Sequence, residues 1–200
     1  TVYTQDTDAV WPVRDLKRQG PLYVVSTHTT SDGIGGNYQT SYTYTGAKAH
    51  MQGRGFLGFR LTQATDPQGI KGITTFRQDW PYVGLASQAK KQQSSGAILN
   101  QVDNTFSCLK PGGSTACTVA VGNTYFPYVS QSVEASNDLN GAAMPTVTTT
   151  NQFDGYGNAT QIVVGTGDGY SKTTTNTYTN DTTNWFLGRL TRSTVASTTP

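Results

Sequence analysis

The sequence predicts an all-β protein, and three observations support that fold class. Thr, Ser, Gly, Asn and Tyr are frequent while Glu occurs once, at Glu134, so the residues that favour long amphipathic helices are scarce. Strand-like runs alternate with turn signals about every 8 to 15 residues. Similar segments also recur along the chain, as stacked β units would require. We expect an antiparallel sheet built from β-hairpins, with a closed β-sandwich or barrel as the alternative.

The first expected strands lie in the N-terminal two fifths of the chain. They cover residues 21–30, 38–44, 56–65 and 70–77. In the second of these, Tyr38, Tyr42 and Tyr44 share one face, because side chains alternate along a strand. A turn is expected at 31–37. Another turn is expected at Asp66-Pro-Gln-Gly69. The Asp side chain supplies a hydrogen-bond acceptor, Pro fixes φ at the second position and Gly is conformationally permissive at the last, which suits a β-turn and predicts a hairpin.

Farther along the chain the strand signals are shorter. They lie at residues 97–99, 118–121 and 125–129, and from Pro145 onward they become a Thr-rich alternation. Residues 84–96 have the one composition that suits a short helix. A loop or a further strand fits them equally, and we favour strand or loop.

Two cysteines flank a turn signal. Cys108 and Cys117 lie on either side of Pro111-Gly-Gly113, with apolar or β-branched residues outside them, which predicts a hairpin. A disulfide between them would contribute about 2 to 3 kcal/mol in the chain-entropy model. Two free thiols are the alternative. Half of a metal site is disfavoured because neither histidine is near in sequence.

The most informative pattern is an internal repeat. An aromatic residue ends a strand, and a polar turn, a glycine, a polar residue and an alternating strand follow. Versions of this unit begin at Tyr42-Thr-Tyr44, at Phe153-Asp-Gly-Tyr-Gly-Asn158 and at Tyr178-Thr-Asn-Asp181. Such units bury a core only when they stack on one another.

Physical chemistry assigns a structural role to the repeated residues. The aromatic ring can pack on the ring of the next unit, for about 0.5 to 1.5 kcal/mol beyond area burial. Asp154 can accept hydrogen bonds from the backbone two residues on, and Gly157 can take a positive φ. Asn158 or Arg189 is then free to point outward or to bridge units.

These residues resemble a known family. Phe153-Asp154-x-x-Gly157-Asn158 and Gly188-Arg-Leu-Thr191 resemble the tyrosine-aspartate (YD) repeat of Rhs proteins, toxin-complex B/C subunits and teneurins. The block Gly53–Arg60, followed by Phe76–Gly84, is similar to the region ahead of the repeats in the toxin-complex B and SpvB-like branch. Phe153 stands where Tyr is usual and Ala159 where Leu is usual. The residues given a motif role are Tyr42, Tyr44, Gly58, Arg60, Phe153, Asp154, Gly157, Asn158, Tyr178, Gly188, Arg189 and Leu190.

The resemblance implies an organisation and a role. It implies one β-rich segment over 1–200, with leading strands in 1–37, a pre-repeat block in 38–85, connecting hairpins in 86–144 and YD-like repeats in 145–200. It also implies a slice of a secreted or cell-surface bacterial shell that encloses a C-terminal toxin. Its partners would be the remainder of the same polypeptide and other toxin-complex subunits. Because the chain starts at Thr1 without Met, we expect any secretion signal to lie outside it.

Charge and reactive residues favour a non-catalytic role. The net charge of +2 is scattered, and pairs such as Lys90-Lys91 fall far short of a polybasic patch, so we expect no nucleic-acid partner. No run approaches the about 20 apolar residues of a membrane span. His28 and His50 have the surroundings of ordinary histidines, and we expect no cofactor and no metal. Turn chemistry explains Asp154 and Asp168 more simply than a calcium loop does.

Two other function classes stay open. Trp11, Trp80 and Trp185 could form stacking platforms for a cell-surface glycan, which gives a carbohydrate- or receptor-binding β module as the alternative. A hydrolase is the weakest hypothesis. Its carboxylate pair would have to come from Asp66, Asp79 or Asp103, and the sequence selects no pair.

Overall fold

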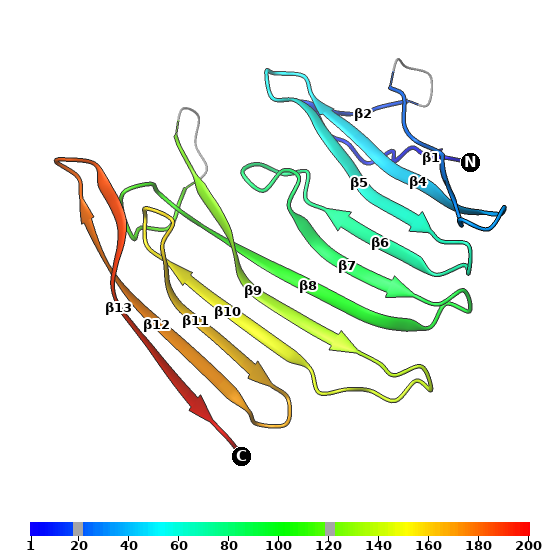
Figure 1. The fold of residues 1–200 in the computed structure, drawn as a ribbon. Coiled ribbons are helices and arrows are strands. Elements are labelled where there is room, and N and C mark those ends of the chain that lie inside the picture. The colour runs from blue at the N-terminus through cyan, green and yellow to red at the C-terminus, as the bar shows by residue number, and fades with distance from the viewer. Residues whose placement is uncertain (18–21, 119–122) are drawn as a thin grey trace. The chain divides into compact units, whose positions relative to one another are not determined.

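The computed structural model describes residues 1–17, 22–118 and 123–200, and all of its regular structure is β (Figure 1). The strands are β1 (Tyr3–Thr4), β2 (Val13–Asp15), β3 (Thr27–Ser31), β4 (Asn37–His50), β5 (Gly55–Thr65), β6 (Lys71–Phe76), β7 (Ala86–Gln92), β8 (Ile98–Leu109), β9 (Phe126–Ser136), β10 (Val147–Phe153), β11 (Ala159–Thr166), β12 (Ser171–Asp181) and β13 (Phe186–Thr198). The all-β prediction is confirmed.

The strands form one open mixed sheet. Its order is β1-β4-β5-β6-β7-β8-β9-β10-β11-β12-β13, with β2 and β3 also pairing with β4. The alternative of a closed sandwich or barrel is therefore wrong, because the path of paired strands has two ends that do not join. One pairing departs from the expected antiparallel pattern, since β1 runs parallel to β4.

The chain divides into two compact units. Unit 1 comprises Thr1–Gln101 with Asn137–Ala142, and unit 2 comprises Val102–Ser136 with Ala143–Pro200. In unit 1, β4, β5, β6 and β7 form successive antiparallel hairpins. In unit 2, β9 to β13 do the same. Sequential hairpins explain why turn signals in the sequence locate the strands well.

The outer edge of β4 is covered by three short strands. β3 pairs with its first residues, β1 with Tyr44 and Thr45, and β2 with Lys48 to His50. The strand expected over 21–30 is shorter than the sequence suggests, because residues 22–26 are not in a strand and β3 begins at Thr27. Pro21 lies outside the described residues. A covered edge offers no free backbone donors or acceptors to another strand.

Several strands extend beyond the expected limits. β4 continues through Gly46 and Ala47 to His50, although small residues carry weak strand signals. Residues 84–96 contain β7, which settles the open choice in favour of a strand. β8 runs from Ile98 to Leu109, well past the expected 97–99, although many of its residues are polar and carry weak strand signals.

One turn geometry recurs between the strands. In the turn from Asp66 to Ile70, the Asp66 N–H donates to the Ile70 carbonyl and the Gly69 N–H donates to the Asp66 carbonyl. Gly69 has a φ of 80°. The same two backbone bonds close the turns that start at Gln93, Asp138, Asp154 and Thr166. A glycine in the left-handed region at the fourth position is therefore the local rule that reverses the chain.

Few side chains are fully enclosed. The buried hydrophobic residues of the described chain are Ala47, Leu57, Cys108 and Leu109. Cys108 and Cys117 form a disulfide with a Cα–Cα distance of 5.4 Å, and the hairpin closes through a bridge between Leu109 and Ala116. The second arm expected at 118–121 lies almost wholly outside the described residues. Within the described ranges, no helix is long and apolar enough to cross a membrane.

Candidate functional site

The repeat motif of unit 2 forms a carboxylate-centred turn. Asp154 Oδ1 accepts hydrogen bonds from the N–H groups of Tyr156 (3.0 Å) and Asn158 (2.9 Å). Gly157 has a φ of 84°, and a Cβ added to it would lie 3.6 Å from the ring of Phe126. The acid and the glycine thus fix the reversal between β10 and β11.

The second oxygen of Asp154 links this turn to the next hairpin. Asp154 Oδ2 accepts from Asn158 Nδ2 (2.9 Å) and from Asn180 Nδ2 (3.2 Å). Asn180 Oδ1 in turn accepts from the backbone N–H of Gly188 (2.8 Å). We call Asp154, Asn158, Asn180 and Gly188 the amide clamp. Asp154, Asn158 and Gly188 come from two separate versions of the sequence motif, and the structure brings them together.

Electrostatics at the amide clamp favour an ionised carboxylate. Partial burial raises the pKa of Asp154. The hydrogen bonds from Asn158, Tyr156 and Asn180 together lower it by more than burial raises it, so the net shift of the pKa is downward. Because the donors are amides, the clamp stabilises the charge with dipoles and no counter-ion.

The aromatic residue of the motif packs within unit 2. The Phe153 ring lies 4.9 Å from the Tyr128 ring centroid and 5.6 Å from that of Phe126. Tyr178 lies directly opposite Leu190 across the β12–β13 pair, and Arg189 is exposed opposite Thr179. These rings belong to neighbouring strands, so they connect hairpins as well as ending strands.

The disulfide hairpin rests against the same turn. The N–H of Gly112 donates to the carbonyl of Gly155 at 2.8 Å. A Cβ on Gly155 would collide with the backbone of Gly113. Two glycines therefore allow the two loops of unit 2 to touch, and this contact is one that the sequence did not suggest.

Unit 1 holds a second, differently charged clamp. The guanidinium of Arg60 binds Asp6 through two of its three nitrogens, with Nε to Oδ2 at 2.6 Å and Nη2 to Oδ1 at 2.9 Å. Gly46 has a φ of 67°, and a Cβ there would collide with the Asp6 carboxylate. We call Asp6, Gly46 and Arg60 the ionic clamp. It fastens the segment after β1 across β4 onto β5.

The surroundings of the ionic clamp hold it in place. Gln78 Nε2 donates to the carbonyls of Gly46 (2.7 Å) and Gly58 (2.8 Å), both left-handed glycines. The hydrogen bond from Arg60 lowers the pKa of Asp6 below its ordinary range. Arg60 was expected from the motif, whereas Asp6 and Gln78 were missed because nothing in their local sequence marks them.

Tyr42 and Tyr44 occupy the middle of β4. The Tyr42 N–H donates to the carbonyl of Ser26 (2.8 Å), and the Tyr44 hydroxyl donates to that of Val25 (3.1 Å). The Tyr44 ring lies 4.8 Å from the Phe59 centroid. Both tyrosines therefore hold residues before β3 against β4.

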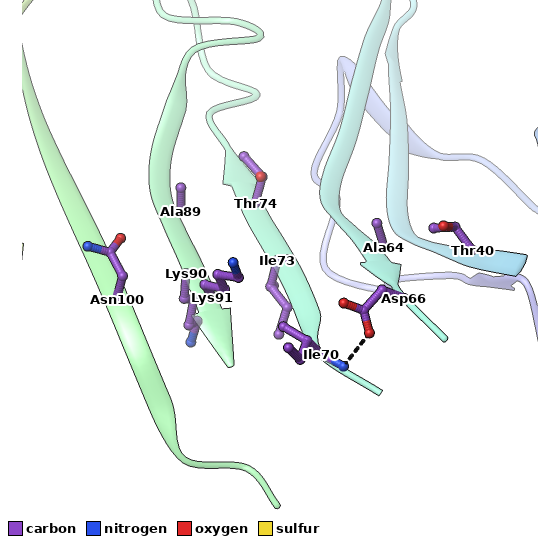
Figure 2. A pocket seen from close by; sticks show the side chains of 11 residues that line it. Thr40, Ala64, Asp66, Ile70, Ile73, Thr74, Ala89, Lys90, Lys91 and Asn100 are labelled. Atoms are coloured by element: carbon purple, nitrogen blue, oxygen red, sulfur yellow. Dashed lines mark hydrogen bonds between the residues drawn. The ribbon is translucent and has the colours of Figure 1, made fainter. Parts of the chain in front are cut away.

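A shallow groove crosses the strands of unit 1 (Figure 2). It has a volume of about 430 Å³ and is lined by Thr40, Ala64, Asp66, Ile70, Gly72, Ile73, Thr74, Ala89, Lys90, Lys91 and Asn100. Asp66 Oδ1 accepts from the N–H of Ile70 at 2.8 Å, so this carboxylate fixes the turn. Asp79, the other acid of unit 1 considered for hydrolysis, binds Arg77 through both oxygens.

The histidines and tryptophans lie on the surface. His28 is exposed in β3, and His50 Nδ1 accepts from the Gln52 N–H at the end of β4. Trp11, Trp80 and Trp185 are 66%, 41% and 73% exposed. Trp11 and Trp80 belong to unit 1 and Trp185 to unit 2. Across the three described ranges, no group of three or more His, Cys, Asp or Glu side chains is arranged to hold a metal ion.

Together, these features define an all-β segment of hairpins held by structural clamps. Residues 14–106 match the family described as the insecticide toxin TcdB middle/N-terminal region. The match supports a relationship to the toxin-complex family, and it includes the whole pre-repeat block expected at 38–85. No curated protein matches this chain.

Proposed function

We propose that this chain is a non-catalytic segment in the wall of a secreted toxin-complex shell. The similarity of residues 14–106 to a toxin-complex region is compatible with such a structural role. The YD-like repeats of 145–200 would continue the sheet into the remainder of the polypeptide, which would enclose a C-terminal toxin. Other toxin-complex subunits would be its further partners.

The observation that carries this proposal is the difference between the outer edge of β4 and the outer edge of β13. The outer edge of β4 is covered by β1, β2 and β3, whereas β13 pairs within the described residues with β12 alone. β13 is 13 residues long and has no proline or acid, with Arg189 and Arg192 as its only charges. A long edge with an uncharged C-terminal half suits a strand that continues into more sheet.

The side chains of β13 fit the same interpretation. Leu190 and Val195 are 55% and 59% exposed, and they face solvent in a strand whose neighbours are mostly Thr and Ser. Edge strands are often protected by charged residues or a bulge. The register of β13 shifts near Arg189 and Arg192, but residues 193–198 pair regularly with β12 and carry no charge. The segment therefore has the features of an internal part of a larger sheet.

Edge association tests the proposal. We expect the purified chain to self-associate at high concentration in sedimentation velocity experiments. Leu190→Lys with Val195→Lys should shift it toward monomer, because charged side chains oppose edge pairing. The control is Tyr23→Lys with Ile34→Lys in unit 1, at side chains that are 95% and 90% exposed. This variant should leave association unchanged.

Two outcomes would count against the wall role. A strictly monomeric wild-type chain at millimolar concentration would mean that β13 does not behave as an open edge. Association that responds equally to the control variant would mean that some other surface drives it.

A further inference from the structure

Three segments of unit 1 meet at the end of the β4–β5 hairpin. The Met51 N–H donates to the Pro12 carbonyl at 2.9 Å, which places the turn at 10–13 beside the turn at 51–54. The Arg54 guanidinium lies 4.8 Å above the ring of Trp80, which brings the segment around residue 80 to the same turn. Residues far apart in the sequence thus share one end of the unit.

The large apolar side chains of these segments are exposed. Val10, Trp11, Met51, Phe56 and Trp80 are 78%, 66%, 49%, 49% and 41% exposed. We call these five residues with Arg54 the tryptophan surface. Exposed apolar side chains gathered in one place mark interaction sites more often than single exposed residues do.

A groove adjoins the tryptophan surface. It has a volume of about 460 Å³, and its apolar lining comes from Val10, Val13 and Phe76. Its charged lining is already paired: Lys48 binds Asp8 at 2.8 Å, and Arg77 binds Asp79 at 2.6 Å. The groove therefore offers apolar contact and few unused polar groups.

Arg54 differs from its charged neighbours. Lys48, Arg60 and Arg77 each have an aspartate partner, whereas no carboxylate of the described chain lies within ion-pair distance of Arg54. Because the Arg54 guanidinium contacts Trp80 by lying over its ring, its N–H donors stay free to bind a partner's carboxylate.

We propose that the tryptophan surface binds a polypeptide segment that carries an apolar side chain next to an acidic one. The apolar side chain would occupy the groove beside Val10, and the acid would bind Arg54. Trp, Met, Phe and Arg are the residues enriched in protein interfaces, and Lys and Glu, which interfaces avoid, do not occur among the six residues. A glycan is a poorer fit because its hydroxyls need several free polar partners, and the charged side chains of the groove are in ion pairs.

A peptide library tests this proposal independently of the β13 edge. A phage library of random dodecapeptides would be selected on the immobilised chain, with counter-selection on Arg54→Glu. We expect enriched peptides to contain Asp or Glu beside an aromatic or branched aliphatic residue. Their binding, measured by tryptophan fluorescence, should weaken about tenfold in Arg54→Ala and further in Trp80→Ala.

Matched variants separate binding from folding. Trp11→Ala provides a second test at a side chain that is 66% exposed, so that a folding defect in Trp80→Ala does not decide the outcome. Ile34→Ser removes an apolar side chain that is 90% exposed in the turn before β4, and should leave binding unchanged. All variants would be compared by thermal unfolding.

Three results would overturn the proposal. One is a library that yields no peptide preferring the wild-type chain to Arg54→Glu. Another is a set of enriched peptides without acids. The third is a glycan-array signal that is lost in Trp11→Ala or Trp80→Ala, which would assign the surface to carbohydrate.

Discussion

The ionic clamp of unit 1 and the amide clamp of unit 2 both join separate segments of the chain, but they do so with different chemistry. Each holds a partly buried aspartate and includes a left-handed glycine of a strand, Gly46 in one and Gly188 in the other. Asp6 binds a guanidinium 54 residues away, whereas Asp154 binds amides 4 and 26 residues away. One clamp neutralises a charge, and the other surrounds it with dipoles.

This difference fits what each clamp joins. The ionic clamp secures a loosely paired N-terminal segment, whose strands β1 and β2 are two and three residues long. Such a segment contributes few backbone hydrogen bonds, so a bidentate ion pair adds strength and direction. The amide clamp joins turns of long, well-paired hairpins, where local hydrogen bonds suffice.

The largest effect is expected from Gly46→Ala. An added Cβ would displace the Asp6 carboxylate, and alanine is strained at a φ of 67°. We expect a loss of about 2 to 4 kcal/mol in unfolding free energy, from backbone strain plus the broken ion pair. Chemical denaturation monitored by tryptophan fluorescence would measure it.

Three other glycines calibrate that result. A Cβ added at Gly72 in β6 would meet open space, and the φ of this residue is ordinary. Gly72→Ala should therefore change the unfolding free energy by less than about 0.5 kcal/mol. Gly58→Ala has a φ of 84° but no steric contact, so it should cost about 1 kcal/mol. Gly188→Ala meets only Asn158 Oδ1 and should fall between Gly58→Ala and Gly46→Ala. An equal cost at Gly46 and Gly58 would show that the ionic clamp contributes nothing.

The next effect distinguishes two turns of the same geometry. Asp154→Ala removes the acceptor of four hydrogen bonds, whereas Asp66→Ala removes the acceptor of two. We expect Asp154→Ala to cost about 1 to 2 kcal/mol more than Asp66→Ala, because its amide partners also lose their acceptor. Equal losses by thermal unfolding would mean that the amide clamp adds nothing to the turn.

The two clamps also show how far the sequence could predict this structure. The Asp154 turn was predictable because an acid and a glycine three residues later determine a local geometry. Asp6 was not, because its partner Arg60 is distant in sequence and the contact depends on how the N-terminal segment crosses β4. Asn180 was not predictable either, because its contact with Asp154 joins residues that are 26 apart in the sequence.

Strand limits follow the same physical rule. Alternation identified β5 and β6 nearly to the residue, because their side chains alternate and the turn between them has its own signal. The extension of β4 through Gly46 and Ala47 was missed, since pairing with β5 outweighs their weak strand preference. The order of the strands was implied by consecutive hairpins, but the parallel pairing of β1 depends on long-range contacts.

The pH dependence of stability provides a smaller test of the ionic clamp. The hydrogen bond from Arg60 lowers the pKa of Asp6, so the folded state holds the ionised form more strongly than the unfolded state does. The pair's contribution is complete above about pH 5 and disappears as the pH falls below about 4 and through the lower pKa of the folded state. Asp6→Asn should therefore be about 1 to 2 kcal/mol less stable than wild type near pH 6. The difference between the two proteins should shrink as the pH falls through the lowered pKa of Asp6. A difference that persists at low pH would attribute the effect to packing instead of charge.

Salt should produce the smallest effect and distinguish the clamps most directly. About 1 M NaCl reduces the screening length to about 3 Å, and the Arg60 side chain is 40% exposed, so solvent ions reach its pair with Asp6. We expect the coupling energy of an Asp6→Asn and Arg60→Gln double-mutant cycle to fall by about 0.5 kcal/mol between low salt and 1 M NaCl. A cycle of Asp154→Asn and Asn180→Ala should not change, because an amide carries no net charge to screen. Equal salt responses in the two cycles would contradict the distinction between a neutralised carboxylate and one held by dipoles.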